Sequence, residues 1–201
     1  MSNSYDDVMA RRSDIMRRAL ALDYDSFQHG DLIFDYDALM SSTGYSLDDV
    51  ARIQAETKVG DTLLYELHRL TEAVREIAGP GKGARILLKD EAANASGSFK
   101  ARRASLSAHE AQAKGFAGIV TATSGNYGAG VASQAAQRGL ACIVIQEIYD
   151  SQHVGQPEIV EKSRACEAYG AEVIKLTVGP ELFYVLLLSL IHISEPTRLR
   201  R

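Results

Sequence analysis

A lysine in a short Ser/Gly-rich loop is the residue of this chain best suited to chemistry. Lys100 ends the segment Asn94-Ala95-Ser96-Gly97-Ser98-Phe99-Lys100, which follows an apolar run and precedes a long helical pattern. The amine is therefore expected on the first turn of a helix, whose positive end disfavours an ammonium ion and favours the neutral nucleophile that imine formation needs. The alternative is a solvent-exposed surface lysine, which is the commonest environment of this residue type.

A second loop with ligand-binding character lies further along the chain. Thr123-Ser124-Gly125-Asn126-Tyr127-Gly128 follows the short apolar run Ile119-Val120-Thr121-Ala122 and opens another helical pattern. At such a strand-to-helix junction, free backbone N–H groups converge and can bind an anion. Ordinary turn chemistry is the alternative for Ser-Gly-Asn. Together with the lysine loop, however, this segment predicts a site for an anionic ligand that carries a carbonyl group.

The elements that position both loops follow a regular alternation from residue 84 onward. The pattern predicts strands over 84–89, 118–123, 141–147 and 171–178, and helices over 98–114, 126–138 and 157–169. Short strands rich in Ile and Val that alternate with helices are typical of an α/β fold with a parallel, twisted sheet covered by helices on both faces. Ligands bind such sheets at the carboxyl ends of the strands, where we expect both loops.

The segment before this alternation is predicted to be mainly helical. Apolar residues at helical spacing indicate a helix over 5–22, with an arginine cluster that forms either a solvated face or, less commonly, a subunit interface. Ser46, followed by Asp48 and Asp49, is typical of a helix start. The turn at 79–83 lacks the Gly-Lys-Ser/Thr ending of a P-loop, which argues against triphosphate binding there.

Composition limits the classes of partner. The chain has 201 residues, 46% of them apolar, and a net charge of −4, so we expect a soluble globular protein that binds neither nucleic acid nor anionic membrane. The two cysteines, Cys142 and Cys166, lie in apolar patterns and indicate buried thiols in a reducing, cytoplasmic compartment. The N-terminus is polar and predicts no signal peptide. No histidine spacing indicates a metal site, and only His153 is a candidate for substrate contact.

With both loops placed, the chain resembles the fold type II, or tryptophan synthase beta-like, group of pyridoxal 5'-phosphate enzymes over about residues 58–187. The resemblance implies that Lys100 is the catalytic lysine that forms the imine with pyridoxal phosphate. It implies that Thr123, Ser124, Gly125 and Asn126 bind the substrate, with Thr123 and Ser124 toward its carboxylate. Asn126 would also face the phenolic oxygen of the cofactor.

Longer strings narrow the resemblance within this group. Residues 89–103, 155–159 and 178–184 are similar to the beta subunits of 2-amino-4-oxopentanoate thiolases. That family cleaves 2-amino-4-oxopentanoate with coenzyme A to acetyl-CoA and alanine during ornithine degradation. The resemblance thus implies a small-molecule amino acid and coenzyme A as substrates, a small alpha subunit as partner, and homo-oligomerisation. Lys100, once displaced from the cofactor by the amino acid, would act as a general acid/base.

The sequence departs from the group in two places. Leu63 stands where the group usually has proline, which removes a fixed backbone angle. The glycine-rich phosphate cup and the residue facing the pyridine nitrogen come later in the group than the end of this chain. We therefore expect an N-terminal helical extension over 1–57, a partial catalytic domain over 58–187 and, over 188–201, a non-native tail that is similar to a translated sequencing adapter. The chain by itself is expected to be inactive.

Two alternatives to a thiolase are compatible with these residues. Threonine synthase, diaminopropionate ammonia-lyase and related beta-eliminating lyases share both loops and differ in substrate. A dinucleotide-binding domain would use Gly125, Gly128 and Gly130 with Glu147 at the end of the next strand. The glycine spacing is the reverse of the expected fingerprint, so the dinucleotide alternative is the weaker of the two.

Overall fold

Three parallel strands form the sheet at the centre of the molecule. The computed structural model describes residues 4–30, 33–177 and 182–194. The strands of the sheet are β5 (Gly118–Ala122), β6 (Ala141–Tyr149) and β7 (Glu172–Thr177), in the order β5-β6-β7. In the register, Val120 lies opposite Ile143, and Ile145 lies opposite Ile174. The predicted α/β fold with a parallel sheet is confirmed.

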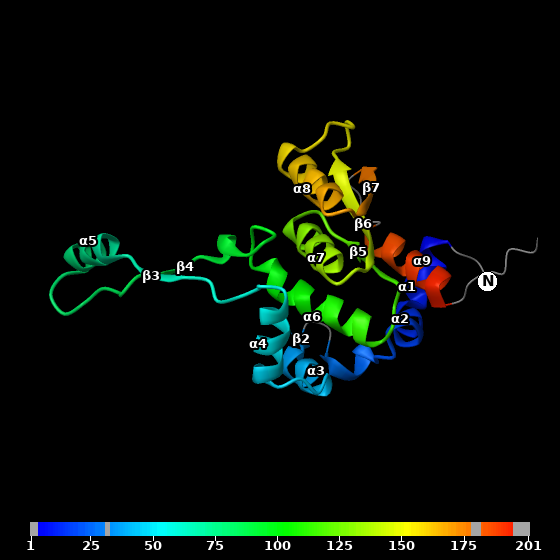
Figure 1. Ribbon diagram of the computed structural model, residues 1–201, viewed down its shortest axis with the longest axis horizontal. Coiled ribbons are helices and arrows are strands. Elements are labelled where there is room, and N and C mark those ends of the chain that lie inside the picture. The colour runs from blue at the N-terminus through cyan, green and yellow to red at the C-terminus, as the bar shows by residue number, and fades with distance from the viewer. Residues whose placement is uncertain (1–3, 31–32, 178–181, 195–201) are drawn as a thin grey trace, which may run out of the picture.

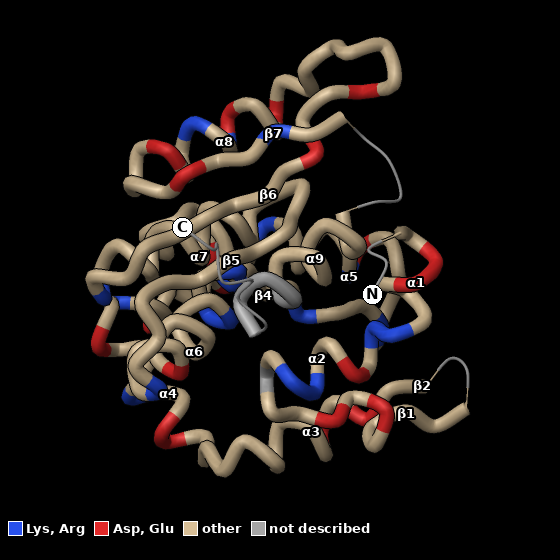
Figure 2. The backbone as a smooth tube through the Cα atoms, turned by 90° about the vertical axis from the view of Figure 1, so that its right-hand side faces the viewer, with Lys and Arg blue, Asp and Glu red and all other residues tan. Residues whose placement is uncertain are grey.

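Helices cover both faces of this sheet. The helices of the alternating region are α6 (Lys100–Ala113), α7 (Asn126–Gln137), α8 (Pro157–Ala168) and α9 (Leu182–Ser194). α7 packs on β5 and β6, α8 packs on β6 and β7, and α6 packs mainly on α7. α9 contacts β5 and β6, and Figure 1 shows β5 between α7 and α9. The view in Figure 2 shows β7, β6 and β5 one below the other, with α9 beside them.

The predicted strand over 84–89 is in a different place from the one expected. β4 (Leu87–Lys89) pairs antiparallel with β3 (Leu64–Glu66) in a separate two-stranded sheet, with Tyr65 opposite Leu88. The prediction that this strand belongs to the parallel sheet is therefore wrong. A run of three apolar residues has no period that distinguishes a buried parallel strand from an exposed hairpin strand, so the pairing partner could not be read from it.

β3, β4 and α5 (His68–Ala78) form an arm that projects from the body of the molecule (Figure 1). Both strands of the arm expose large apolar side chains, and Ile77 on α5 is 88% exposed. The expected turn at 79–83 is present, with the Lys82 N–H donating to the Gly79 carbonyl at 3.1 Å. Exposed apolar surface of this extent is typical of an interface.

The N-terminal region is helical, as predicted, but is divided into short elements. They are α1 (Tyr5–Ala10), α2 (Arg12–Leu20), the 3-10 helix η1 (Tyr24–Phe27), β1 (Gln28–His29), β2 (Ile33–Phe34), α3 (Tyr36–Ser42) and α4 (Leu47–Glu56). The single helix predicted over 5–22 is interrupted at Arg11, whose φ of −101° and ψ of 8° are not helical. α4 begins with the predicted cap, a capping box between Ser46 and Asp49.

The arginine cluster of this region is on the surface. Arg17, for example, pairs with Asp14 at 2.7 Å and with Asp23 at 3.2 Å while its side chain is 47% exposed. Val8 and Ile15, on the other faces of α1 and α2, are buried with Leu187 of α9.

α9 continues from Leu187 to Ser194, and residues 178–181 and 195–201 lie outside the described residues. The division of the chain at 57 and 187 remains a prediction.

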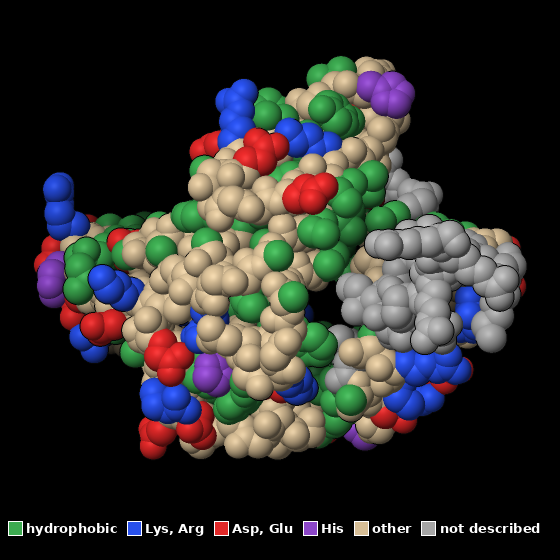
Figure 3. All heavy atoms as spheres, turned by 45° about the vertical axis from the view of Figure 1, so that its right-hand side comes forward, with side chains coloured by type: hydrophobic (Ala, Val, Ile, Leu, Met, Phe, Trp, Pro, Cys, Tyr) green, Lys and Arg blue, Asp and Glu red, His purple; other side chains and the backbone are tan. Residues whose placement is uncertain are grey.

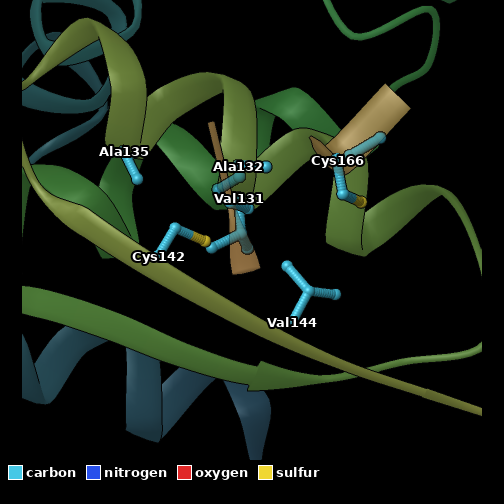
Figure 4. Close-up of a cluster of buried hydrophobic side chains, with 9 residues drawn as sticks. Val131, Ala132, Ala135, Cys142, Val144 and Cys166 are labelled. Atoms are coloured by element: carbon cyan, nitrogen blue, oxygen red, sulfur yellow. The ribbon is translucent and has the colours of Figure 1, made fainter. Parts of the chain in front are cut away.

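The main core lies between α7, α8 and β6. Figure 4 shows the sulfur of Cys142 pointing from β6 toward Val131 of α7, with Val144 and Cys166 beside them. Burial raises the pKa of each cysteine thiol to about 11. The prediction that both cysteines are buried thiols is confirmed, since both are free and buried.

The described surface carries charges of both signs. On the face drawn in Figure 3, Lys and Arg side chains are interspersed with Asp and Glu side chains. None of the helices in the described ranges is long and apolar enough to cross a membrane. His, Cys, Asp and Glu side chains form no metal-binding group within those ranges either.

Candidate active site

Lys100 is the first residue of α6 and is half-buried. Its Nζ lies 4.5 Å from the centroid of the Phe99 ring, a contact in which the ring face attracts a cation. Its backbone N–H donates to the hydroxyl of buried Ser98 at 3.4 Å. Among the described residues, no carboxylate forms an ion pair with Nζ, so the amine is available to a ligand. The predicted place of Lys100 on the first turn of a helix is confirmed.

A glycine contact fixes this turn against α7. A Cβ on Gly130 would lie 3.3 Å from both the carbonyl carbon and the carbonyl oxygen of Lys100. A Cβ on Gly128 would lie 2.8 Å from the Thr123 methyl group and 2.9 Å from Val144. The two glycines thus allow the first turns of α7 to approach both the lysine and the second loop.

The second loop connects β5 to α7 and ends at Gly125, the N-cap residue. The Thr123 N–H donates to the Ile145 carbonyl at 2.9 Å, which extends the parallel pairing by one residue. The Gly125 N–H donates to the Thr123 hydroxyl at 3.1 Å. Ser124 and Asn126 are exposed, and their side chains have no hydrogen-bond partner in the part of the chain that the structure describes. The loop therefore presents a hydroxyl and an amide at the positive end of a helix, where an anion binds.

Polar residues that sequence analysis did not single out lie beside the lysine loop. Arg102, on the first turn of α6, donates to both carboxylate oxygens of Glu91, at 2.8 Å each. The Arg102 guanidinium, first, and then the Thr62 hydroxyl and the Asn94 amide hold the pKa of Glu91 down at about 2. The pair spans eleven positions and joins a 3-10 turn to a helix, so no local spacing rule identifies it.

The glycines of the dinucleotide alternative have another use in the structure. Gly128 and Gly130 are buried inside α7 and serve the contacts with Thr123 and Lys100, which is a packing role. His153, the candidate for substrate contact, is exposed, has a φ of 61°, and lies 3.4 Å from the Thr177 hydroxyl through Nδ1. These positions do not favour a nucleotide site, and they leave the role of His153 a prediction.

The polar groups at this site fit the aldehyde and the phenolic oxygen of pyridoxal phosphate. The amine of Lys100 suits the aldehyde, and the free hydroxyl and amide of Ser124 and Asn126 suit the phenolic oxygen or a bound carboxylate. The first backbone N–H groups of α7, on Asn126 and Tyr127, also have no acceptor among the described residues, as a site for an anionic oxygen requires.

Comparison with known proteins agrees with this chemistry. Residues 55–183 match the family described as pyridoxal-phosphate dependent enzyme. The chain is 62% identical over 187 residues to a 2-amino-4-ketopentanoate thiolase beta subunit from an unknown prokaryotic organism, covering 93% of this chain and 40% of that protein. It is 58% identical over 181 residues to the protein of the same name from Acetoanaerobium sticklandii, covering 90% and 39%. The chain thus spans about 40% of the length of these relatives.

Solved structures show the same architecture. The crystal structure of a T.th. threonine deaminase has a TM-score of 0.54 and 27% sequence identity, covering 75% of this chain and 43% of that one. A pyridoxal 5'-phosphate-dependent aspartate racemase has a TM-score of 0.57 at 24% identity, covering 74% and 43%, which shows similarity of fold. The fold of this chain is therefore one that is found in a solved pyridoxal-phosphate enzyme.

Proposed function

The chain belongs to the family of pyridoxal-phosphate dependent enzymes, and from this premise we propose that it is the part of a thiolase that carries the reactive lysine. The reaction is cleavage of 2-amino-4-oxopentanoate by coenzyme A to acetyl-CoA and alanine. The observation that carries the proposal is that Lys100 is half-buried, has no carboxylate partner among the described residues, and lies on a turn packed against α7. The two thiolase beta subunits that are 62% and 58% identical supply the substrate class.

In this proposal each loop has a separate task. Lys100 holds the cofactor and, when released by the incoming amino acid, accepts and returns a proton at its Nζ. Thr123, Ser124 and the backbone of Gly125 bind the substrate carboxylate at the start of α7. Asn126 donates to the phenolic oxygen of the cofactor. The contact of Gly130 with Lys100 keeps the lysine at a fixed distance from the loop that begins α7.

The net reaction moves one acetyl group and one proton. The bond between C3 and C4 of the amino acid breaks, and C4 bonds to the sulfur of coenzyme A. C3 receives a proton, in balance with the one lost by the thiol, and becomes the methyl group of alanine. When bound, pyridoxal phosphate would withdraw electrons from the carbon skeleton of the amino acid. The proposal assigns the transfer of this proton to Lys100.

Partners and pathway belong to the same proposal. The name beta subunit on both relatives supports an alpha subunit as partner. We further propose that this subunit is small, that the protein forms homo-oligomers, and that it acts in the cytoplasm in ornithine degradation. A threonine synthase-like or diaminopropionate ammonia-lyase-like reaction is the alternative. It shares the lysine and both loops but needs no coenzyme A.

Reductive trapping tests the proposal. Pyridoxal phosphate is added, the product is reduced with borohydride, and the digested protein is mapped by mass spectrometry. We expect a pyridoxyl group on Lys100, lost in Lys100→Ala and kept in Lys114→Ala, whose exposed amine pairs with Glu110 at 2.8 Å. A label on other lysines only would overturn the role of Lys100.

The substrate is tested on full-length protein that carries these residues. We expect acetyl-CoA and alanine to form in equal amounts from 2-amino-4-oxopentanoate, only when coenzyme A is present, and not in Lys100→Ala. Release of ammonia from diaminopropionate or another beta-substituted amino acid, without acetyl-CoA formation, would select the lyase alternative instead.

A further inference from the structure

An ion pair closes the loop that carries Lys100. Glu91 begins the 3-10 helix η2 (Glu91–Ala93), and Arg102 lies two residues after Lys100 on α6. Arg102 Nε lies 2.8 Å from Glu91 Oε2, and Nη2 lies 2.8 Å from Oε1. The two side chains are 34% and 21% exposed. A two-point contact between a planar guanidinium and a carboxylate restricts orientation as well as distance, so it fixes the two ends of the loop relative to each other.

The carboxylate of Glu91 has further donors. The Thr62 hydroxyl donates to Oε1 at 2.9 Å, and the Asn94 amide donates to Oε2 at 3.0 Å. Asn94 is 4% exposed, and its own oxygen accepts the Gly60 N–H at 3.0 Å. Each oxygen of Glu91 thus has two donors, and the beginning of the lysine loop is tied to residues 60–62.

Arg102 is held on its other side by α4. Its Nη1 donates to the Gln54 side-chain oxygen at 3.3 Å, and the Gln54 amide donates to the Arg102 carbonyl at 3.3 Å. Gly60 has a φ of +84°, and a Cβ there would lie 3.1 Å from Nη1. A side chain at position 60 would therefore be strained and would crowd the guanidinium.

Lys100 shares the first turn of α6 with Arg102. On this turn, the backbone of Lys100 lies against Gly130 of α7. A shift of Arg102 therefore moves the lysine relative to α7 and to the loop at 123–126, because the turn is one hydrogen-bonded unit. Arg102 itself points to Glu91 and Gln54, and each of its three guanidinium nitrogens donates one hydrogen bond to them.

We propose that Glu91 and Arg102 are positioning residues for Lys100, which act by closing the loop so that the amine meets the aldehyde of pyridoxal phosphate in a reactive orientation. The inference rests on the proposed function, and it adds to it two residues that touch neither cofactor nor substrate. Loss of the pair should slow the reaction of Lys100 rather than weaken cofactor binding, because no atom of the pair is assigned to the ligand.

Reductive trapping measures the rate at which Lys100 reacts with the aldehyde and needs no enzymatic turnover. Condensation of Nζ with the aldehyde forms a carbon–nitrogen bond and releases one water. Borohydride then adds hydride to the former aldehyde carbon, the nitrogen takes a proton from solvent, and pyridoxyl-lysine remains. The rate of label on Lys100 is measured against pyridoxal phosphate concentration in the unsubstituted chain, Glu91→Gln, Arg102→Gln and the double variant.

We expect the rate at saturating pyridoxal phosphate to fall about tenfold in each single variant, with less than about a twofold change in the half-saturating concentration. The double variant should be no slower than either single one, because the two residues act as a unit. Glu66→Gln is the matched control. It removes the carboxylate of another Glu–Arg pair, Glu66 with Arg85 at 2.7 Å on the arm, and should leave the rate unchanged.

The label on Lys89 and Lys114 in the same digest separates positioning from unfolding, since unfolding changes all lysines together. If a variant does not fold, Thr62→Val decides, because it removes one hydrogen bond from Glu91 and leaves the ion pair in place. It should lower the rate by about twofold to threefold. Equal rates in all folded variants would overturn the positioning role while the proposed function stands. Absence of label on Lys100 in the unsubstituted chain would overturn the proposed function itself.

Discussion

The two loops of the candidate site are held in opposite ways. The lysine loop, residues 94–100, is closed by side chains on and around residues 91–102: one ion pair and hydrogen bonds with Thr62, Asn94 and Gln54. The loop at 123–126 has one internal side-chain bond, from the Gly125 N–H to Thr123, and among the described residues its Ser124 and Asn126 side chains have no partner.

Under the proposed function this difference matches two roles: the lysine loop forms a covalent bond with the cofactor, and the loop at 123–126 binds a ligand. A lysine that must meet an aldehyde benefits from a fixed position before the ligand arrives. A loop that binds a carboxylate benefits from donors that are free, because each donor already paired within the protein must exchange partners on binding. The first loop should therefore contribute to stability, and the second should contribute mainly to ligand binding.

The largest effect on stability is expected where the loop at 123–126 joins the core through α7. A Cβ at Gly128 would lie within 3.0 Å of both Thr123 and Val144, in a fully packed region, so Gly128→Ala should lower the free energy of unfolding by about 2–3 kcal/mol. Gly125→Ala, at the N-cap of the same helix, is the control, with no atom within 4 Å of its Cβ, and should cost less than about 0.5 kcal/mol. Urea denaturation measures both changes. Equal free-energy costs of the two substitutions would show that the close contacts of Gly128 do not stabilise the junction between the loop and α7.

The second largest effect on stability is expected at the lysine loop, which the pair of Glu91 and Arg102 closes. Glu91→Gln leaves the partly buried Arg102 guanidinium without its counter-charge and should lower the free energy of unfolding by about 2 kcal/mol. Glu66→Gln, in the more exposed pair on the arm, should cost less than about 0.5 kcal/mol. Thiol labelling of Cys142 and Cys166 provides the control, because both lie in a core cluster that contains neither Glu91 nor Arg102 and should stay protected in native Glu91→Gln. A cost as small as that of Glu66→Gln would remove the contrast between the loops.

The pH dependence of stability should identify Glu91 as the titrating group. Its pKa is lowered from the usual 4.5 to about 2, chiefly by Arg102, so its contribution is complete above about pH 4.5 and is lost as the pH falls toward 2. Over this range the unsubstituted chain should lose about 1–2 kcal/mol more than Glu91→Gln does, after allowance for solvent screening. Thermal unfolding of both proteins between pH 6 and pH 2.5 measures the difference. Parallel curves would assign the acid sensitivity to other carboxylates.

The sequence was sufficient for the parts of the site that follow local rules. Helix starts at Lys100 and Asn126 were predicted to within about two residues, because a strand, a short loop and a helical period are local patterns. The resemblance to pyridoxal-phosphate enzymes also came from contiguous strings and is confirmed by the family match over residues 55–183.

Features set by distant contacts were not predictable in the same way. β4 was placed in the wrong sheet, because its three residues fit either partner. The pair of Glu91 and Arg102 went unrecognised as a contact, because it depends on how η2 folds back on α6 and on the space left by Gly60. Such contacts are consequences of tertiary packing, which single-residue patterns do not encode.

The smallest effect on stability should accompany a clear effect on binding, which is the strictest test of the comparison. Ser124 is exposed and unpaired among the described residues, so Ser124→Ala should change the free energy of unfolding by less than about 0.5 kcal/mol. If its hydroxyl binds the substrate carboxylate, the alanine concentration that halves pyridoxyl labelling of Lys100 should rise about tenfold, the equivalent of one lost hydrogen bond to a charged group. Ser151→Ala, at another exposed serine, should change neither quantity. A loss of stability in Ser124→Ala without a change in alanine protection would reverse the roles of the two loops, because the open loop would then be structural.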